Sequence, residues 1–201
     1  DRLAELVCSN SLKSEAEHSA PWLLKQELRR LDSLLLHAAA EARVPGGQAL
    51  TVDREVFAEF VCEAIGSNPN IELRREELTD VPGDSILIIA PGPLTSDALA
   101  SAIARITGSG RLHFYDSISP IVEADSIDLS IAFRASRYGK SLDQSDDYLN
   151  CPFDRTQYET FVDALLAADR YEAHIAEDEA PFFEACLPVE ELAPRGPGPR
   201  R

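Results

Sequence analysis

One short apolar segment constrains the fold of this chain more than any other feature. Residues 85–90 read Ser-Ile-Leu-Ile-Ile-Ala, and they lie between the turn sequence Pro82-Gly83-Asp84 and the sequence Pro91-Gly92-Pro93. Apolar residues that do not alternate with polar ones are typical of a central strand that is covered on both faces. Because helical patterns lie on both sides of this segment, the sequence predicts an α/β fold.

Two helices are predicted before this segment. The first covers residues 19–42, and the second follows Asp53, which can act as its N-cap, and ends at Gly66. Short strands are expected at residues 50–52 and 71–73. Apolar residues at helical spacing predict the inward faces of the two helices, and these are Leu24, Leu28, Leu31 and Leu35 in the first and Val56, Phe57, Phe60, Val61 and Ala64 in the second.

The pattern changes in the second half of the chain. A helix over residues 97–107, capped by Thr95 or Ser96, is followed by apolar segments at 112–115 and 118–122 that are expected to be strands of a separate sheet. A capping box at Asp154–Gln157 predicts a last helix to about Asp169, with an inward face formed by Tyr158, Phe161, Val162 and Leu165. A second subdomain is therefore expected to begin near residue 110.

The composition limits the classes of partner. The chain has 35 acidic and 19 basic side chains and a net charge of −16, so its overall charge gives no electrostatic footprint for nucleic acid, and any RNA surface must be local. No apolar stretch approaches the roughly 20 residues that cross a bilayer, and the N-terminus shows no leader pattern. We therefore expect a soluble, cytoplasmic protein without a membrane partner.

The cysteines and histidines do not form a metal-binding pattern. The four cysteines are Cys8, Cys62, Cys151 and Cys186, with no C-x-x-C pair and no clustered histidine among them. A zinc site and a disulfide framework are both unexpected, and free thiols in a reducing compartment are the natural interpretation. The chain also contains no methionine and ends in a Pro- and Gly-rich tail, so we expect it to be part of something longer.

Two of the cysteines are candidates for chemistry. Cys8 lies in a cluster of small hydrogen-bonding residues with Lys13 nearby, a setting that can favour a thiolate. Cys186 lies among aromatic residues and prolines, where Glu184 or Glu190 can accept a proton. The alternative for each is a small buried residue in a packed segment, and sequence spacing does not separate the two interpretations. Cys62 and Cys151 favour a structural role.

Two glycine segments can bring the backbone close to a ligand. They are Val44-Pro45-Gly46-Gly47 and Pro91-Gly92-Pro93, and each suits a planar or phosphate-bearing ligand as well as it suits a plain turn. Gly108-Ser109-Gly110 is the only G-x-G sequence in the chain, but it follows a helix and precedes a strand. That order is the reverse of a dinucleotide-binding turn, so we exclude it.

Ten short segments, in order along nearly the whole chain, resemble one protein family. They are Ala4–Ser11, Leu23–Leu31, Val44–Gly47, Val52–Glu55, Pro93–Leu99, Phe114–Ile118, Pro120–Val122, Ser136–Tyr138, Asp147–Pro152 and Phe182–Pro188. The chain resembles the TrmFO family of folate- and FAD-dependent tRNA uridine C5-methyltransferases.

The resemblance implies a reaction with three cofactors and tRNA. Methylenetetrahydrofolate gives a one-carbon unit, and reduced FAD, recharged by NAD(P)H, carries electrons and carbon to uracil C5. Because C5 is a poor nucleophile, a cysteine thiolate must first add at C6. The two functional cysteines of the family match Cys8 and Cys186. We expect Cys186 to add to uracil and Cys8 to act as its partner at the flavin, and the exchanged assignment stays open.

The resemblance also implies a set of cofactor-binding residues. Those expected to approach FAD are Pro45, Gly46, Gly47, Asp53, Arg54, Pro91 and Gly92. The family reads Ala-Thr-Gly where this chain has Ala90-Pro91-Gly92. Proline in place of threonine removes a hydroxyl and a backbone donor beside the cofactor, so part of the family's hydrogen bonding is not expected here.

The implied architecture is an incomplete FAD-binding domain of the glutathione-reductase-like type with an inserted α+β subdomain. Residues 1–109 would form the former, residues 110–193 the latter, and residues 194–201 a tail. Because the family's glycine-rich FAD turn and its carboxyl-terminal third have no counterpart, we expect this chain alone to bind FAD poorly and to be inactive. A homodimer would supply a missing surface. The alternative is a truncated, non-catalytic homologue that binds nucleic acid, DNA included.

Overall fold

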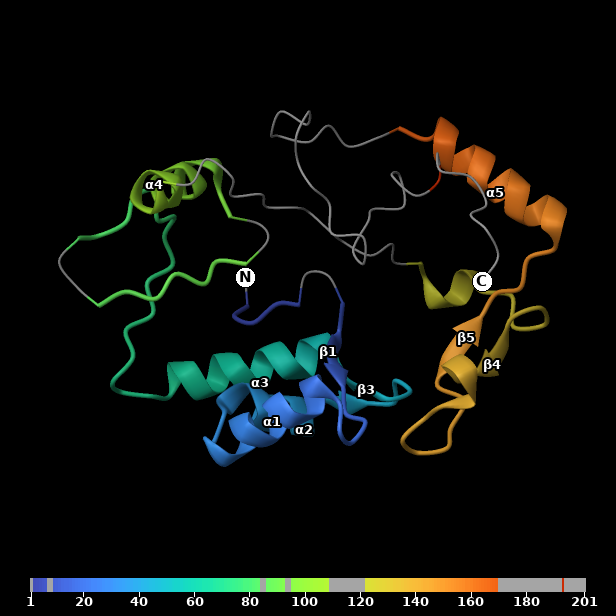
Figure 1. Cartoon of the computed structure of the whole chain (residues 1–201), viewed down its shortest axis with the longest axis horizontal. Helices are drawn as coiled ribbons and strands as arrows, with labels where there is room; N and C mark the ends of the chain where they lie inside the picture. The colour runs from blue at the N-terminus through green and yellow to red at the C-terminus, as the bar shows by residue number, and fades with distance from the viewer. Residues whose placement is uncertain are drawn as a thin grey trace. The chain divides into compact units, whose positions relative to one another are not determined.

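The chain forms two compact units. The computed structural model describes residues 2–6, 9–83, 86–92, 95–108, 122–169 and 193. Residues 1–76 and 118–151 make up the first unit, and residues 77–117 and 152–201 make up the second. Figure 1 shows their helices and strands. The predicted boundary near residue 110 falls outside the described residues and stays a prediction.

A three-stranded antiparallel sheet forms the centre of the first unit. Its order is β1-β3-β2, with β1 at Ser11–Ser14, β2 at Arg43–Val44 and β3 at Ala49–Val52. Thr51 of β3 pairs with Ser11 on one side and with Val44 on the other. The predicted strand at 50–52 is therefore confirmed, and it is held by hydrogen bonds on both edges.

Three helices build the core around this sheet, and they are α1 at Ala20–Arg30, α2 at Leu34–Glu41 and α3 at Arg54–Gly66 (Figure 1). Strand β3 contributes Val52, which is fully buried, and α3 contributes Phe57 and Val61. Each such side chain stabilises the fold by about 1.5–3 kcal/mol. Val56 was predicted to face inward but is exposed, whereas the next residue, Phe57, is buried, so the inward face of α3 begins at Phe57.

The predicted helix over residues 19–42 is wrong in one respect, because it is two helices. Asp32 adopts a left-handed conformation with φ of +59°. Its N–H donates to the carbonyl of Arg29 at 3.2 Å, and the N–H of Ser33 donates to the carbonyl of Leu28 at 3.1 Å. This pair of bonds is a Schellman motif, which ends α1 and turns the chain into α2. Of the predicted leucine stripe only Leu28 packs against the core, and the other three leucines are exposed.

A second, two-stranded sheet completes the first unit. Strand β4 at Phe133–Ala135 pairs antiparallel with β5 at Tyr148–Asn150. The 3₁₀ turns η1 at Ala124–Ser126 and η2 at Arg137–Gly139 lie on either side of β4. The sequence patterns did not predict this hairpin, because each strand has only three residues and neither is buried.

The second unit contains the predicted helices α4 at Asp97–Thr107 and α5 at Arg155–Ala167. Ser96 caps α4, which ends at a left-handed Gly108, and the capping box between Asp154 and Gln157 opens α5. The predicted inward face of α5 is wrong for Tyr158 and Phe161, which are both more than 40% exposed. Phe161 stacks instead on Phe153, with ring centroids 5.4 Å apart.

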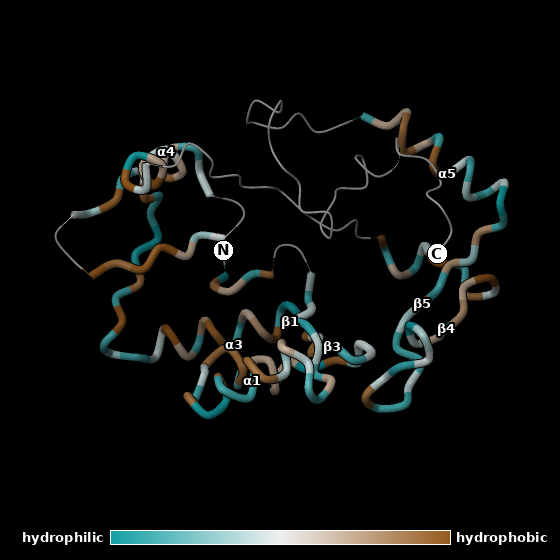
Figure 2. The backbone as a smooth tube through the Cα atoms, in the orientation of Figure 1, coloured by the Kyte–Doolittle hydropathy of each residue, from teal (hydrophilic) through white to brown (hydrophobic). Residues whose placement is uncertain are grey.

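The two remaining strand predictions for described residues are wrong. Residues 71–73 and 86–90 form no strand, and Ile86 and Ile88 are almost fully exposed, although Figure 2 shows the apolar character of residues 86–90. A central strand needs a hydrogen-bonding neighbour on each edge, and no described segment pairs with these residues. Ser85 and the predicted strands at 112–115 and 118–121 lie outside the described residues. What the structure describes is a mixed α and β fold with antiparallel sheets.

Within the described ranges, none of the helices has the length and apolar character that a membrane span requires.

Candidate functional site

The flavin residues predicted for the first unit lie at the two ends of strand β3. Pro45, Gly46 and Gly47 precede the strand, and Asp53 and Arg54 follow it. A strand of four residues is about 13 Å long, so the two groups lie on either side of β3 and do not form one cluster.

Asp53 acts as the N-cap of helix α3, as predicted. Its Oδ1 accepts hydrogen bonds from the N–H groups of Glu55 at 2.9 Å and Val56 at 3.1 Å. Its own N–H donates to the carbonyl of Ala42 at 2.7 Å. A carboxylate repels an anionic ligand, so the group at this junction that can meet one is the guanidinium of Arg54, the first residue of the helix.

Gly46 and Gly47 are both buried, and each needs the absence of a side chain for a reason within the protein. A Cβ atom on Gly46 would lie 1.6 Å from Oγ1 of Thr51. Gly47 has a φ of +65°, and a Cβ atom on it would lie 3.1 Å from the hydroxyl oxygen of Tyr148. The turn is therefore shaped by its own neighbours, which explains why glycine occupies both positions.

The loop between β4 and β5 holds this glycine turn. We call residues 136–147 the polar loop. Oδ2 of Asp147 accepts a hydrogen bond from the N–H of Gly47 at 2.5 Å, and the hydroxyl of Tyr148 donates to the carbonyl of Gly46 at 2.7 Å. The N–H of Leu142 donates to the carbonyl of Gly47 at 3.1 Å. Residues about a hundred positions apart in the sequence are thus brought together.

Hydroxyl groups of the polar loop stabilise the ionised form of Asp147. The Ser145 hydroxyl donates to Oδ1, and the Ser141 hydroxyl donates to Oδ2 at 2.9 Å. The bond from Ser145 lowers the pKa of Asp147 most, and the bonds from the Gly47 N–H and the Ser141 hydroxyl lower this pKa further below its ordinary value of 3.8. Asp147 is therefore a carboxylate near neutral pH.

The segment that follows Cys8 is fixed at the other end of β3. Cys8 itself lies outside the described residues. Nδ2 of Asn10 donates to the carbonyl of Val52 at 2.9 Å, and the N–H of Val52 donates to the carbonyl of Asn10 at 3.0 Å. The residue two positions after Cys8 is thus held directly beside the residue that precedes Asp53.

A buried lysine fixes strand β1, the continuation of the same segment. Lys25 of helix α1 is only 5% exposed. Its Nζ donates to the carbonyls of Leu12 at 3.0 Å and Ser14 at 2.8 Å, and it lies 3.5 Å from Oε1 of Glu15. A buried ammonium group requires such partners, so Lys25 ties α1 to the strand through charge-assisted hydrogen bonds.

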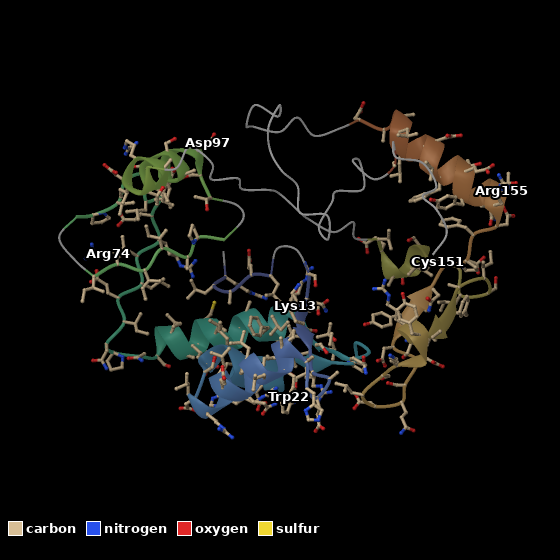
Figure 3. The ribbon with its side chains drawn as sticks, in the orientation of Figure 1. Lys13, Trp22, Arg74, Asp97, Cys151 and Arg155 are labelled. Atoms are coloured by element: carbon tan, nitrogen blue, oxygen red, sulfur yellow. The ribbon has the colours of Figure 1, made fainter. Side chains whose placement is uncertain are left out.

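The two described cysteines differ in their environment. Cys62 in α3 is half-buried, and its Sγ accepts a hydrogen bond from the N–H of Leu3 at 3.1 Å. Cys151 follows strand β5 and is exposed (Figure 3). Both are free thiols. Cys186, the second predicted catalytic cysteine, lies outside the described residues. Within the part of the chain that the structure describes, no cluster of His, Cys, Asp and Glu is suited to a metal ion.

Pro91 and Gly92 belong to the second unit. Both are exposed, and Gly92 has a φ of +77°. The hydroxyl of Thr95 donates to the carbonyl of Gly92 at 2.9 Å. A Cβ atom on Gly92 would have no neighbour within 4 Å among the described residues. The positive φ, and not a close contact, therefore explains why glycine occupies this position.

Comparison with known proteins gives one consistent result. A family model described as glucose inhibited division protein A matches residues 1–198. A methylenetetrahydrofolate–tRNA-(uracil-5-)-methyltransferase TrmFO from Solibacter usitatus is 68% identical over 98% of this chain, and one from Geobacter sulfurreducens is 56% identical over 96% of it. The chain belongs to this family, within its TrmFO group. Membership confirms the resemblance carried by the ten segments.

The chain spans less than half the length of these TrmFO relatives. It covers 44% of the proteins from Solibacter usitatus and Geobacter sulfurreducens, and 43% of a relative from Anaeromyxobacter that is 55% identical to it.

Sequence reasoning missed the residues that hold the glycine turn of this chain. Asp147 and Tyr148 belong to one of the segments that resemble the family, but no role was assigned to them. The signal in the sequence is the polar stretch from Ser141 to Asp147, which is typical of a loop in which side chains bond to the backbone. That signal predicts a structured loop but does not identify the glycine turn as its partner.

Proposed function

We propose that this chain supplies the thiols and part of the cofactor surface for folate- and FAD-dependent methylation of uridine C5 in tRNA. The names of its relatives specify methylenetetrahydrofolate, tRNA and the 5-position of uracil, and the proposal extends these to this chain. The observation that carries it is the pair of hydrogen bonds between Asn10 and Val52, since they hold the segment after Cys8 beside Asp53 and Arg54.

The junction of β3 and α3 fits a phosphate-bearing cofactor such as FAD in its chemistry. Arg54 brings a permanent positive charge to the start of a 13-residue helix whose first N–H groups are capped by the carboxylate of Asp53. Since Asp53 accepts hydrogen bonds from Glu55 and Val56, the guanidinium group of Arg54 is the proposed partner of the cofactor's phosphates. Of the predicted turn residues Pro45, Gly46 and Gly47, Pro45 is exposed and is proposed to meet the flavin ring, while the two buried glycines shape the turn.

The proposed chemistry of the chain's own groups centres on sulfur. When bound, methylenetetrahydrofolate would supply a carbon at the oxidation level of formaldehyde, and FAD reduced by NAD(P)H would supply the two electrons that convert this carbon to a methyl group. The thiolate of Cys186 adds to C6 of uracil, so that a C–S bond forms and the electrons of the C5–C6 double bond move to C5. After C5 has bonded to the carbon unit, loss of the C5 proton restores the double bond and expels the thiolate. Cys8 acts as the partner thiol that takes up or returns a proton.

Two proteins test the proposal. The first is the 201-residue chain, and the second is the Solibacter usitatus relative in which this chain replaces the matching 196 residues. We expect the chain alone to retain little flavin, because its sequence contains no glycine-rich turn for a pyrophosphate. The chimera is expected to show the visible absorbance of oxidised flavin and to transfer a methyl group to a tRNA transcript.

Cysteine variants of the chimera test the roles of the thiols. Cys8→Ala and Cys186→Ala are each expected to abolish methyl transfer while flavin absorbance is retained, whereas Cys151→Ala, at an exposed position, is the matched control and should stay active. Full activity of either of the first two variants would remove that thiol from the mechanism. A flavin-free chain that binds nucleic acid with a steep salt dependence would favour the non-catalytic alternative.

A further inference from the structure

We call the hydrogen bonds of Asp147 and Tyr148 with Gly47 and Gly46 the clasp. It joins parts of the first unit that are far apart in the sequence. The N–H of Gly47 and its acceptor Asp147 are separated by 100 residues, and the carbonyl of Gly46 and its donor Tyr148 are separated by 102. Arg43 of β2 and Asp143 of the polar loop add an ion pair at 3.8 Å. Three kinds of contact therefore connect strand β2 and the turn that follows it to the polar loop and to the first residue of β5.

These contacts occupy the polar backbone groups of the turn. The carbonyl of Gly46 accepts from the hydroxyl of Tyr148 and from the N–H of Ala49, at 2.7 and 3.1 Å. The N–H of Gly47 donates to Asp147, and the carbonyl of Gly47 accepts from the N–H of Leu142. A ligand that used the Gly47 N–H or the Gly46 carbonyl as a hydrogen-bond partner would have to displace a bond within the protein.

The carboxylate of Asp147 is also held by hydroxyl groups within the polar loop. Hydroxyl groups of Ser141 and Ser145 donate to its two oxygens, and its N–H donates to the hydroxyl of Ser136 at 3.4 Å. A carboxylate fixed in this way loses little conformational freedom when it accepts the Gly47 N–H. The clasp is therefore built to hold one conformation of the turn.

We propose that Asp147 and Tyr148 are positioning residues that fix the Gly46–Gly47 turn by bonding to the Gly47 N–H and the Gly46 carbonyl. A flat, ring-bearing ligand then meets the turn at the exposed Pro45 and not at these backbone groups of the two buried glycines. The ligand part of this inference rests on the proposed function, which places the flavin ring at this turn. The clasp itself depends only on the contacts described above.

Amide hydrogen exchange in the ¹⁵N-labelled 201-residue chain tests the clasp without any ligand. Asp147→Ala removes the acceptor, so the Gly47 amide should exchange at least about tenfold faster. Asp147→Asn keeps an uncharged oxygen acceptor and should give an intermediate rate, with the Gly47 amide proton shifted upfield. Asp146→Ala removes the neighbouring exposed carboxylate and is the matched control. The amide of Val52, bonded to Asn10, should keep its rate in all variants.

Tyrosine variants test the second contact in a protein that keeps the carboxylate. Tyr148→Phe removes one hydroxyl from the carbonyl of Gly46 and should shift the neighbouring Gly47 amide resonance, while Tyr138→Phe, at an 84% exposed residue, should not. The proposal is overturned if Gly47 exchanges at the wild-type rate in Asp147→Ala. It is also overturned if Val52 accelerates as much as Gly47, because Asp147 would then only support the stability of the whole unit.

Addition of FAD to the ¹⁵N-labelled chimera separates this inference from the proposed function, because the chain alone is expected to bind FAD poorly. If FAD binds, resonances around the turn should shift while the Gly47 amide keeps its slow exchange. If FAD displaces Asp147, the exchange rate of the Gly47 amide will change. That result would refute the proposal that the ligand leaves the backbone hydrogen bonds of the turn intact. If the chain and the chimera both fail to bind FAD, the proposed function fails, and the exchange rates of Gly47 still decide whether Asp147 and Tyr148 position the turn.

Discussion

Substitution of Gly46 by alanine is the sharpest test of how rigidly the glycine turn is held. The new Cβ atom would lie 1.6 Å from Oγ1, 2.7 Å from Cβ and 2.9 Å from Cγ2 of Thr51. Rotation of the Thr51 side chain cannot relieve the contact, because its Cβ is itself too close. Strand β3 cannot move aside either, since Thr51 is paired on both edges. The turn must therefore shift.

The size of the loss follows from these contacts. Overpacking a well-packed site costs about 1–3 kcal/mol, and loss of the bond from Tyr148 to the Gly46 carbonyl adds about 1 kcal/mol. We expect Gly46→Ala to lower the free energy of unfolding of the first unit by about 2–4 kcal/mol. Gly66→Ala is the control, because nothing lies within 4 Å of its Cβ position at the end of α3. It should be neutral or stabilise by about 0.4–1 kcal/mol.

Urea unfolding followed by tryptophan fluorescence measures both variants. The chain has one tryptophan, Trp22 in helix α1, which belongs to the same unit as the glycine turn. If Gly46→Ala unfolds at the same urea concentration as Gly66→Ala, the turn accommodates a side chain freely, and the argument that Thr51 and the clasp fix it is refuted.

Two further predictions concern charged groups of the first unit. Lys25→Met leaves the carbonyls of Leu12 and Ser14 without their donor, so the free energy of unfolding in urea should fall by about 2–4 kcal/mol. Lys13→Met, at an exposed position, should change it little. Equal urea midpoints for the two variants would contradict the role of the buried ammonium group. The lowered pKa of Asp147 predicts a stabilising contribution that is fully present above pH 3.8 and decreases as the pH falls through the lowered value. The difference in urea midpoint between wild type and Asp147→Asn should therefore shrink below pH 3.8, and a constant difference would argue against it.

Local signals in the sequence predicted the helix starts well. Asp53, Ser96 and Asp154 all act as N-caps as expected, because a cap depends on a side chain and on backbone groups two or three residues away. The break between α1 and α2 is also local, but it was missed because the leucine spacing continues across the left-handed Asp32. Apolar periodicity alone does not detect a chain reversal.

Features that depend on distant residues were not predictable in the same way. The apolar run at 86–90 indicates the environment that a segment prefers, but a strand also needs neighbours, and none of the described segments pairs with it. The clasp between Asp147 and Gly47 joins residues whose separation no local pattern encodes. The roles of Cys8 and Cys186 stay a prediction, because both residues lie outside the described part of the chain.

The position of the clasp in the sequence has a consequence for the order in which the first unit folds. Joining Gly47 to Asp147 closes a loop of 100 residues, and ring closure of that length costs about 4 kcal/mol of chain entropy. The short-range hairpin of β2 and β3 can form early, but its turn acquires its final shape only after the β4–β5 hairpin has been synthesised and has docked. Assembly of the glycine turn is thus a late event, and a chain that ended before residue 148 would never complete it.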